Sequence, residues 1–180
     1  RRVLFRSEMP CRDNGALDTA RLPDMLHQMN RSGEAKRVKA IYFMGYFGNP
    51  TGICMNATEK DALAQVLFDA ELLVPIIEDA AYRELYFQTP WPVPSIIGHE
   101  SLGDFPILYL GTFTKPFATG MKVGFGFCNH ADWMARMLSV KGHQDFGTAN
   151  FSQVILERML EEGLYRKQLD AQRQHYSAKA

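Results

Sequence analysis

The sequence is poor in cysteine, carries no net charge and has no long apolar run. Its three cysteines are odd in number and lack the paired spacing of metal sites, which argues against a disulfide framework. The 20 basic and 20 acidic residues cancel, and no basic block suggests a surface for nucleic acid or an anionic membrane. No apolar stretch is long enough for a membrane span or for the core of a signal peptide. We therefore expect a soluble, cytoplasmic protein.

What the sequence does contain is an alternation of helical and strand patterns. The 180 residues are 46% hydrophobic and 22% charged, as expected for one globular α/β domain. Apolar residues at helical spacing predict helices over 18–30, about 59–71, about 131–140 and 152–164, and the polar tail predicts a long exposed helix. Apolar and β-branched runs predict strands over 38–43, 72–77, 106–110 and 123–128. The alternation predicts a layered α/β fold.

Three local patterns refine this prediction. Thr58 with Asp61 three residues later resembles a capping box, which places the start of the second helix near residue 59. The continuous apolar run 72–77 is typical of a strand that is buried on both faces. Residues 88–101 contain three prolines and a glycine and predict a surface loop.

Polar side chains follow three of the predicted strands. Asn49 comes after the first strand, Asp79 after the second with Tyr82 three residues on, and Lys115 after the third. Open α/β sheets bind ligands at the carboxyl ends of their parallel strands. We therefore expect these side chains to meet at one edge of the sheet.

The residue types suit the cofactor pyridoxal phosphate. A lysine amine such as that of Lys115 can condense with an aldehyde to form a Schiff base. A carboxylate such as that of Asp79 keeps a pyridine nitrogen protonated, so that the ring can act as an electron sink. Asn49 and Tyr82 can donate hydrogen bonds to the ring's phenolic oxygen. The phosphate needs hydroxyl groups and a cation, which Thr112, Thr114 and Lys122 can supply.

These motifs together resemble the class I/II aminotransferases of pyridoxal phosphate (PLP) fold type I. The sequence has Asn-Pro-Thr-Gly at 49–52, Asp-x-x-Tyr at 79–82, Thr-x-Thr-Lys at 112–115 and Gly-x-Lys-x-Gly at 120–124. Each motif alone is common, but their order and context are specific. The sequence departs from the family at Lys122, where an arginine is usual, and at Thr119, where proline is frequent; a lysine lacks the planar fork that grips phosphate.

The resemblance implies a role for each motif residue. Lys115 would carry the internal aldimine, Asp79 would pair with the pyridine nitrogen, and both, with Tyr82, are the candidate catalytic residues. The candidate cofactor-binding residues are Asn49, Asp79, Tyr82, Thr112, Thr114, Lys115 and Lys122, and no metal site is expected.

The resemblance also implies the fold and the extent of the chain. It predicts a three-layer α/β/α fold with a mostly parallel sheet and one antiparallel strand, as part of the large PLP-binding domain. We divide the chain into 1–12, a non-native or disordered N-terminus, and 13–180, a partial large domain. The substrate-carboxylate arginine and the ring-stacking residue of the family would lie outside this chain. Family members form homodimers.

The implied reaction is the transfer of an amino group between an amino acid and a 2-oxo acid, with the chain alone weak or inactive. Three alternatives stay open. The same pocket serves other fold type I PLP enzymes, such as C–S lyases, decarboxylases and racemases, because the cofactor supplies a common carbanion chemistry. Related domains also act as ligand sensors in transcription regulators that carry a DNA-binding helix-turn-helix. The third alternative is a family member that has lost its cofactor.

Overall fold

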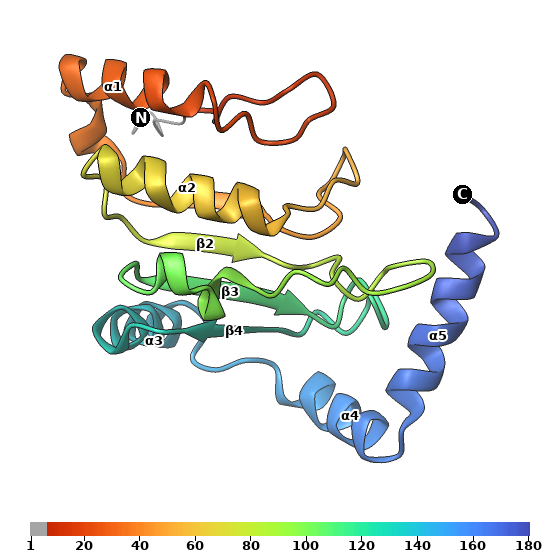
Figure 1. The fold of residues 1–180 in the computed structure, drawn as a ribbon. Coiled ribbons are helices and arrows are strands. Elements are labelled where there is room, and N and C mark those ends of the chain that lie inside the picture. Colours follow the sequence, from red (N-terminus) through yellow and green to blue (C-terminus); the bar gives the residue numbers. More distant parts are fainter. Residues whose placement is uncertain (1–6) are drawn as a thin grey trace.

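The computed structural model describes residues 7–180 and contains one four-stranded sheet (Figure 1). Its strands are β1 (Ile41–Met44), β2 (Ile76–Asp79), β3 (Ile107–Thr112) and β4 (Gly124–Cys128), and they lie in this order across the sheet. β1, β2 and β3 are parallel, whereas β4 is antiparallel to β3. This confirms the predicted mostly parallel sheet with one antiparallel strand.

Five α-helices accompany the sheet in the described part of the chain. They are α1 (Leu22–Ser32), α2 (Ala57–Asp69), α3 (Ala131–Asp145), α4 (Asn150–Glu161) and α5 (Leu164–Ser177). Short 3-10 helices span Glu34–Arg37, Ile96–Gly98 and Glu100–Leu102. Helices α1 and α2 cover one face of the sheet, and α3 contacts β4 (Figure 1).

The core lies between α1, α2 and one face of the sheet. Alternation along each strand directs Ile41, Ile76 and Ile107 to this face, where they pack with Leu63 and Leu67 of α2. The opposite face is more open, since Tyr42 on β1 is 54% exposed. On β2 itself, Ile76 and Glu78 are buried while Ile77 and Asp79 are half-buried, so the strand predicted over 72–77 is fully buried on one face only.

Strand pairing, rather than apolar content, sets where the strands begin. β2 starts at Ile76, four residues later than the run 72–77 suggested, and extends through Asp79. Leu72 is buried in the core before the strand begins, and Leu73 is 56% exposed. An apolar run thus predicts contact with the core, but not every residue in the run forms the hydrogen bonds of a strand.

The start of α2 differs from the predicted capping box. The N-cap is Asn56, whose side chain accepts a hydrogen bond from the Glu59 backbone at 2.9 Å, while the Glu59 carboxylate accepts one from the Asn56 backbone at 2.9 Å. Thr58 lies inside the first turn instead. Asparagine followed three residues later by glutamate fits the capping chemistry better than Thr58 with Asp61, because glutamate is long enough to reach back to the N-cap.

Removing this cap should have a moderate effect on stability. Asn56→Ala should lower the free energy of unfolding by about 1 kcal/mol, because the Glu59 backbone N–H loses its side-chain acceptor. The measurement is equilibrium urea unfolding. Thr58→Ala is the matched control and should change the free energy by less than about 0.5 kcal/mol, since that side chain is exposed. Equal effects for both variants would contradict the assignment of Asn56 as the cap.

Both ends of the described chain pack against other elements. The long helix predicted in the tail is present as α5 and most of its residues are exposed, but Leu169 and Arg173 are 2% and 8% exposed, so it buries one face. Near the other end, Cys11 forms a β-bridge with Leu17, and Arg12 pairs with Glu59 at 3.7 Å. Residues 1–6, part of the predicted N-terminal segment 1–12, lie outside the described residues, and the division at residue 12 stays a prediction.

Within residues 7–180, none of the helices has both the length and the apolar character needed to cross a membrane.

Candidate cofactor site

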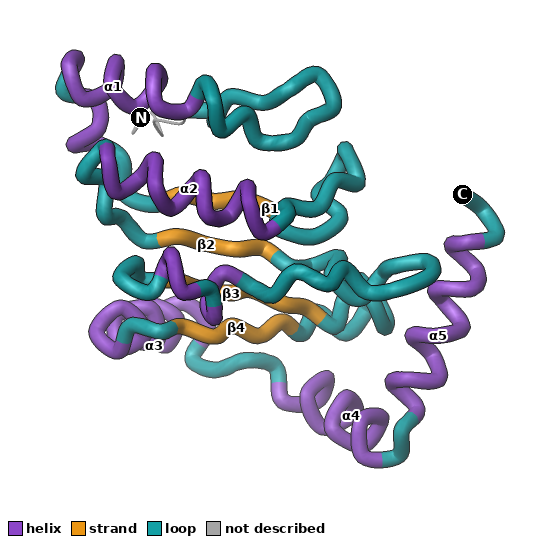
Figure 2. Tube along the Cα trace, viewed as in Figure 1, coloured by secondary structure: helices purple, strands orange, loops and turns teal. Residues whose placement is uncertain are grey.

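The predicted site residues gather at the carboxyl edge of the parallel strands. Asp79 is the last residue of β2 and Thr112 the last residue of β3, with Lys115 in the loop that follows. In register across the sheet, Met44 pairs with Asp79 and Asp79 with Leu110, so these strands end side by side. The loops that leave these strands extend from the same edge (Figure 2).

The structure brings Lys115 and Tyr82 together from two different loops. The Nζ atom of Lys115 lies 5.6 Å from the centre of the Tyr82 ring, within the range of a cation–π contact. Lys115 is exposed and Tyr82 is half-buried, so the amine remains accessible to a small molecule. This pair links the loop after β3 to the loop after β2.

Asp79 is held at the strand end by two hydrogen bonds. Its Oδ2 accepts from the Tyr42 hydroxyl at 2.7 Å, and its Oδ1 accepts from the Ala81 backbone N–H at 3.0 Å. Burial, followed by the hydrogen bond to Asp79, raises the pKa of Tyr42 to about 12. Tyr42 was not among the predicted site residues. Alternation places Tyr42 on the same face of β1 as Met44, but only the strand register of the structure shows that Met44 is the neighbour of Asp79.

The raised pKa gives a test of this contact. The folded-state pKa of Tyr42 lies above the unfolded value of 10.0, so the neutral phenol stabilises the folded protein. This contribution to stability is complete below pH 10 and is lost as the pH rises towards about 12. Asp79→Ala should lower the Tyr42 pKa without returning it fully to 10.0, because burial remains. The measurement is an NMR titration of ring-labelled tyrosines, with Tyr42→Phe to assign the signal. A Tyr42 pKa unchanged by Asp79→Ala would contradict the hydrogen bond.

The candidate phosphate-binding residues are close in sequence but engaged differently. The Thr112 hydroxyl donates to the Val123 carbonyl at 3.1 Å and accepts from the Thr114 backbone at 3.0 Å. Lys122 is exposed and has a left-handed backbone with φ of 53°. Such a conformation costs about 1–2 kcal/mol for a residue with a side chain, and strain of this kind is frequent at functional sites.

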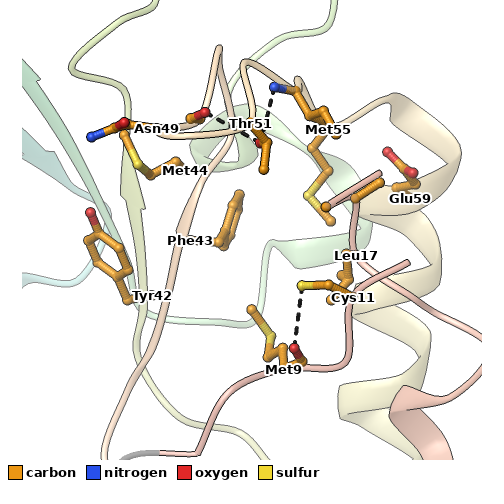
Figure 3. A pocket seen from close by; sticks show the side chains of 14 residues that line it. Met9, Cys11, Leu17, Tyr42, Phe43, Met44, Asn49, Thr51, Met55 and Glu59 are labelled. Carbon is orange, nitrogen blue, oxygen red and sulfur yellow. Dashed lines mark hydrogen bonds between the residues drawn. The ribbon is translucent and has the colours of Figure 1, made fainter. Parts of the chain in front are cut away.

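Asn49 lies at the rim of a cavity of about 310 Å³ at the β1 edge of the sheet (Figure 3). Tyr42 and Asn49 lie on one side of this cavity, while Met55 and Glu59 lie on the other (Figure 3). Asn49 is exposed, and within residues 7–180 no side-chain hydrogen bond joins it to Lys115, Asp79 or Tyr82. No group of three histidine, cysteine, aspartate or glutamate side chains suited to a metal gathers within residues 7–180.

A buried ion pair lies directly behind Asp79. Glu78, the preceding residue of β2, points to the opposite face and pairs with Lys60 of α2 at 3.4 Å, both side chains being fully buried. Glu78 also accepts hydrogen bonds from Ser95 and from the Ile96 backbone N–H, and Lys60 donates to the Pro94 carbonyl. Burial lowers the pKa of Lys60, while Glu78 opposes the shift. The predicted loop 88–101 thus fixes the strand that carries Asp79.

Comparison with known proteins shows the class to which this architecture corresponds. No protein-family model matches the chain. A 2-aminoadipate transaminase from Thermus thermophilus is 30% identical over 146 residues, which are 81% of this chain and 36% of that protein. A kynurenine aminotransferase from Pyrococcus horikoshii, solved in complex with PMP, superposes with a TM-score of 0.80 at 27% identity, over 96% of this chain and 40% of that one.

A third relative belongs to a different functional class. An HTH-type transcriptional regulator from Bacillus subtilis, YdfD, is 28% identical over 157 residues, which are 85% of this chain and 30% of that protein. The chain therefore spans less than half the length of each relative. The fold is that of the PLP fold type I class. Its neighbours in sequence and structure include aminotransferases of this class, which confirms the resemblance seen in the motifs.

Proposed function

We propose that the protein binds pyridoxal phosphate through Lys115 and is part of an aminotransferase that moves an amino group between an amino acid and a 2-oxo acid. The observation that carries this proposal is the Lys115 amine over the Tyr82 ring, at the sheet edge where Asp79 ends β2. The transaminase and aminotransferase relatives support it. Because the chain spans less than half of each, we expect it to be weak or inactive alone.

The donor chemistry of the described residues fits this cofactor. An aldehyde needs a primary amine in solvent contact, which Lys115 presents. A pyridine nitrogen needs a fixed carboxylate, and Asp79 is oriented by Tyr42 and Ala81. When bound, pyridoxal phosphate supplies an electron-poor ring that accepts the electron pair released at the substrate's Cα.

Each residue has a distinct task in this proposal. Lys115, once free of the cofactor, would carry a proton to and from the substrate carbon as a general acid and base. Asp79 would hold the proton on the pyridine nitrogen, and the Tyr82 hydroxyl and Asn49 amide would donate to the phenolic oxygen. Thr112 would have to exchange its bond to the Val123 carbonyl for one to the phosphate. Lys122 would act on the phosphate as a point charge, and Thr114 would add a hydroxyl.

Trapping the cofactor tests the proposal. The protein is mixed with pyridoxal phosphate, treated with borohydride to make the attachment permanent, and digested for peptide mass mapping. We expect one dominant modified peptide, with the modification on Lys115, and an absorbance that disappears on reduction. Modification spread evenly over the exposed lysines, or none at all, would overturn the proposal.

A second candidate is a ligand-sensing domain of a transcription regulator, which the similarity to the B. subtilis regulator favours. The two candidates differ in what an amino acid does to the cofactor in the full-length protein. An aminotransferase converts the bound aldehyde to the amine form in step with consumption of the amino acid, and a 2-oxo acid reverses the change. A sensor shows a saturable spectral change without net conversion. A lyase or decarboxylase instead releases a cleavage product.

A further inference from the structure

Helix α5 bonds to both loops of the candidate site. The Gln172 side-chain Nε2 donates to the backbone carbonyl of Phe117 at 2.7 Å, two residues beyond Lys115. The Arg173 Nε donates to the backbone carbonyl of Glu84 at 2.8 Å, two residues beyond Tyr82. Adjacent side chains of one helix therefore hold corresponding points of the two loops, and α5 stands beside the carboxyl edge of the sheet (Figures 1 and 2).

The Arg173 attachment is strong and buried. The Arg173 side chain is 9% exposed, and its Nη2 lies 3.2 Å from the Glu84 carboxylate. Its Nη1 bonds to Asp170 at 3.0 Å, and the guanidinium carbon lies 3.7 Å from the centre of the Tyr86 ring. A planar guanidinium can make all these contacts at once, whereas a lysine ammonium cannot. The loop after Tyr82 is therefore fixed to α5 by several bonds.

The Phe117 side of the contact is also well packed. The Tyr165 ring of α5 lies 5.5 Å from the ring centres of both Phe113 and Phe117. Phe117 is 7% exposed and belongs to a small core cluster with Val123 and Leu156. The loop that carries Lys115 is thereby held against α5 and α4 on either side of the lysine.

Gln172 is a costly residue for stability alone. While its Nε2 bonds to Phe117, its Oε1 is buried and has no hydrogen-bond partner in the described part of the chain. A buried acceptor without a partner is destabilising. An apolar side chain of the same size would remove this acceptor but would leave the Phe117 carbonyl without its donor. Gln172 provides a hydrogen bond to the Phe117 carbonyl of the loop, which an apolar residue could not form.

We propose that Gln172 and Arg173 are positioning residues that hold the Lys115 and Tyr82 loops at a fixed separation and thereby set the affinity of Lys115 for pyridoxal phosphate. This inference rests on the proposed function. The 5.6 Å contact between Lys115 and Tyr82 joins residues that no strand pairing connects directly, since both lie in loops. Their separation therefore depends on what holds the loops, and α5 is the element that bonds to both.

The experiment compares Gln172→Met and Arg173→Met with the unaltered protein. The apparent dissociation constant for pyridoxal phosphate should rise about threefold to tenfold in Gln172→Met, as expected for the loss of one positioning hydrogen bond. It should rise by at least as much in Arg173→Met, which loses two hydrogen bonds to Glu84. Amide hydrogen exchange without cofactor should accelerate in 113–122 for Gln172→Met and in 80–88 for Arg173→Met. The thermal midpoint of Gln172→Met should change little, because removal of the unpaired Gln172 acceptor offsets the loss of the donor to the Phe117 carbonyl.

Matched controls come from the same region. Gln168→Met alters an exposed glutamine of α5, and Arg158→Met alters an arginine of α4 whose side chain is 71% exposed in its pair with Glu161. Neither should change the affinity or the exchange. Arg173→Lys should fall between Arg173→Met and the unaltered protein, because it keeps the charge without the fork. If Arg173→Met does not fold, Gln172→Met and Arg173→Lys still decide the question.

Two failures can be told apart. If the unaltered protein attaches no cofactor at Lys115, the proposed function fails, and loop exchange still reports whether α5 holds the loops. If the unaltered protein labels at Lys115 while folded Gln172→Met labels with the same affinity and the same loop exchange, the positioning role is overturned and the proposed function stands.

Discussion

Lys115→Ala should abolish the borohydride-stable attachment of pyridoxal phosphate to this protein, with labelling reduced to background. The reaction requires an amine that can reach the aldehyde and lose its proton. Lys115 is exposed and lies over the Tyr82 ring at the sheet edge. Lys60, by contrast, is fully buried and paired with Glu78, so its amine cannot reach a cofactor in solution. The measurement is quantitative mass mapping at matched cofactor concentration.

A second lysine variant tests whether removing any exposed lysine would reduce the labelling. Lys141→Ala removes an amine that pairs with Asp145 on the surface of α3, and it should leave labelling unchanged. Circular dichroism of Lys115→Ala should match the unaltered protein, because an exposed side chain is removed. Persistent labelling of folded Lys115→Ala at another lysine would place the cofactor elsewhere and end the assignment.

The sequence was sufficient to predict the elements that place Asp79 and Lys115. That prediction rested on the residue types and on their positions after the strands, because the carboxyl ends of parallel strands lie at the same edge of a sheet. The structure puts Asp79 at the end of β2 and Lys115 in the loop after β3, and it brings Lys115 to Tyr82. Whether these residues bind the cofactor stays a prediction.

What sequence could not predict depends on contacts between distant segments. Tyr42 bonds to Asp79 because of strand register, which the apolar pattern does not specify. Arg173 lies in a polar tail, and a basic residue in such a tail predicts exposure, yet partners on the loop after Tyr82 make its burial favourable. Glu78 directly follows the apolar run 72–77, and nothing near it in the sequence predicted that a lysine of α2 would lie beside it.

Breaking the buried pair of Lys60 and Glu78 should have a large effect on stability. Lys60→Met should lower the free energy of unfolding by about 3–5 kcal/mol, because it leaves the Glu78 carboxylate buried without its cation. Methionine fills nearly the same volume, so little of the loss comes from a cavity. Equilibrium urea unfolding at neutral pH measures the change. Lys141→Met is the matched control, and the loss of its solvent-exposed pair with Asp145 should lower the free energy of unfolding far less.

The double variant Lys60→Met with Glu78→Gln should recover most of that loss. A neutral glutamine can still accept hydrogen bonds from Ser95 and the Ile96 backbone, while the charge that needed Lys60 is gone. The double variant should therefore lie within about 1–2 kcal/mol of the unaltered protein, the remainder reflecting the lost bond to the Pro94 carbonyl. Two results would contradict this explanation. One is that Lys60→Met lowers the free energy of unfolding no more than Lys141→Met does. The other is that adding Glu78→Gln to Lys60→Met lowers it further.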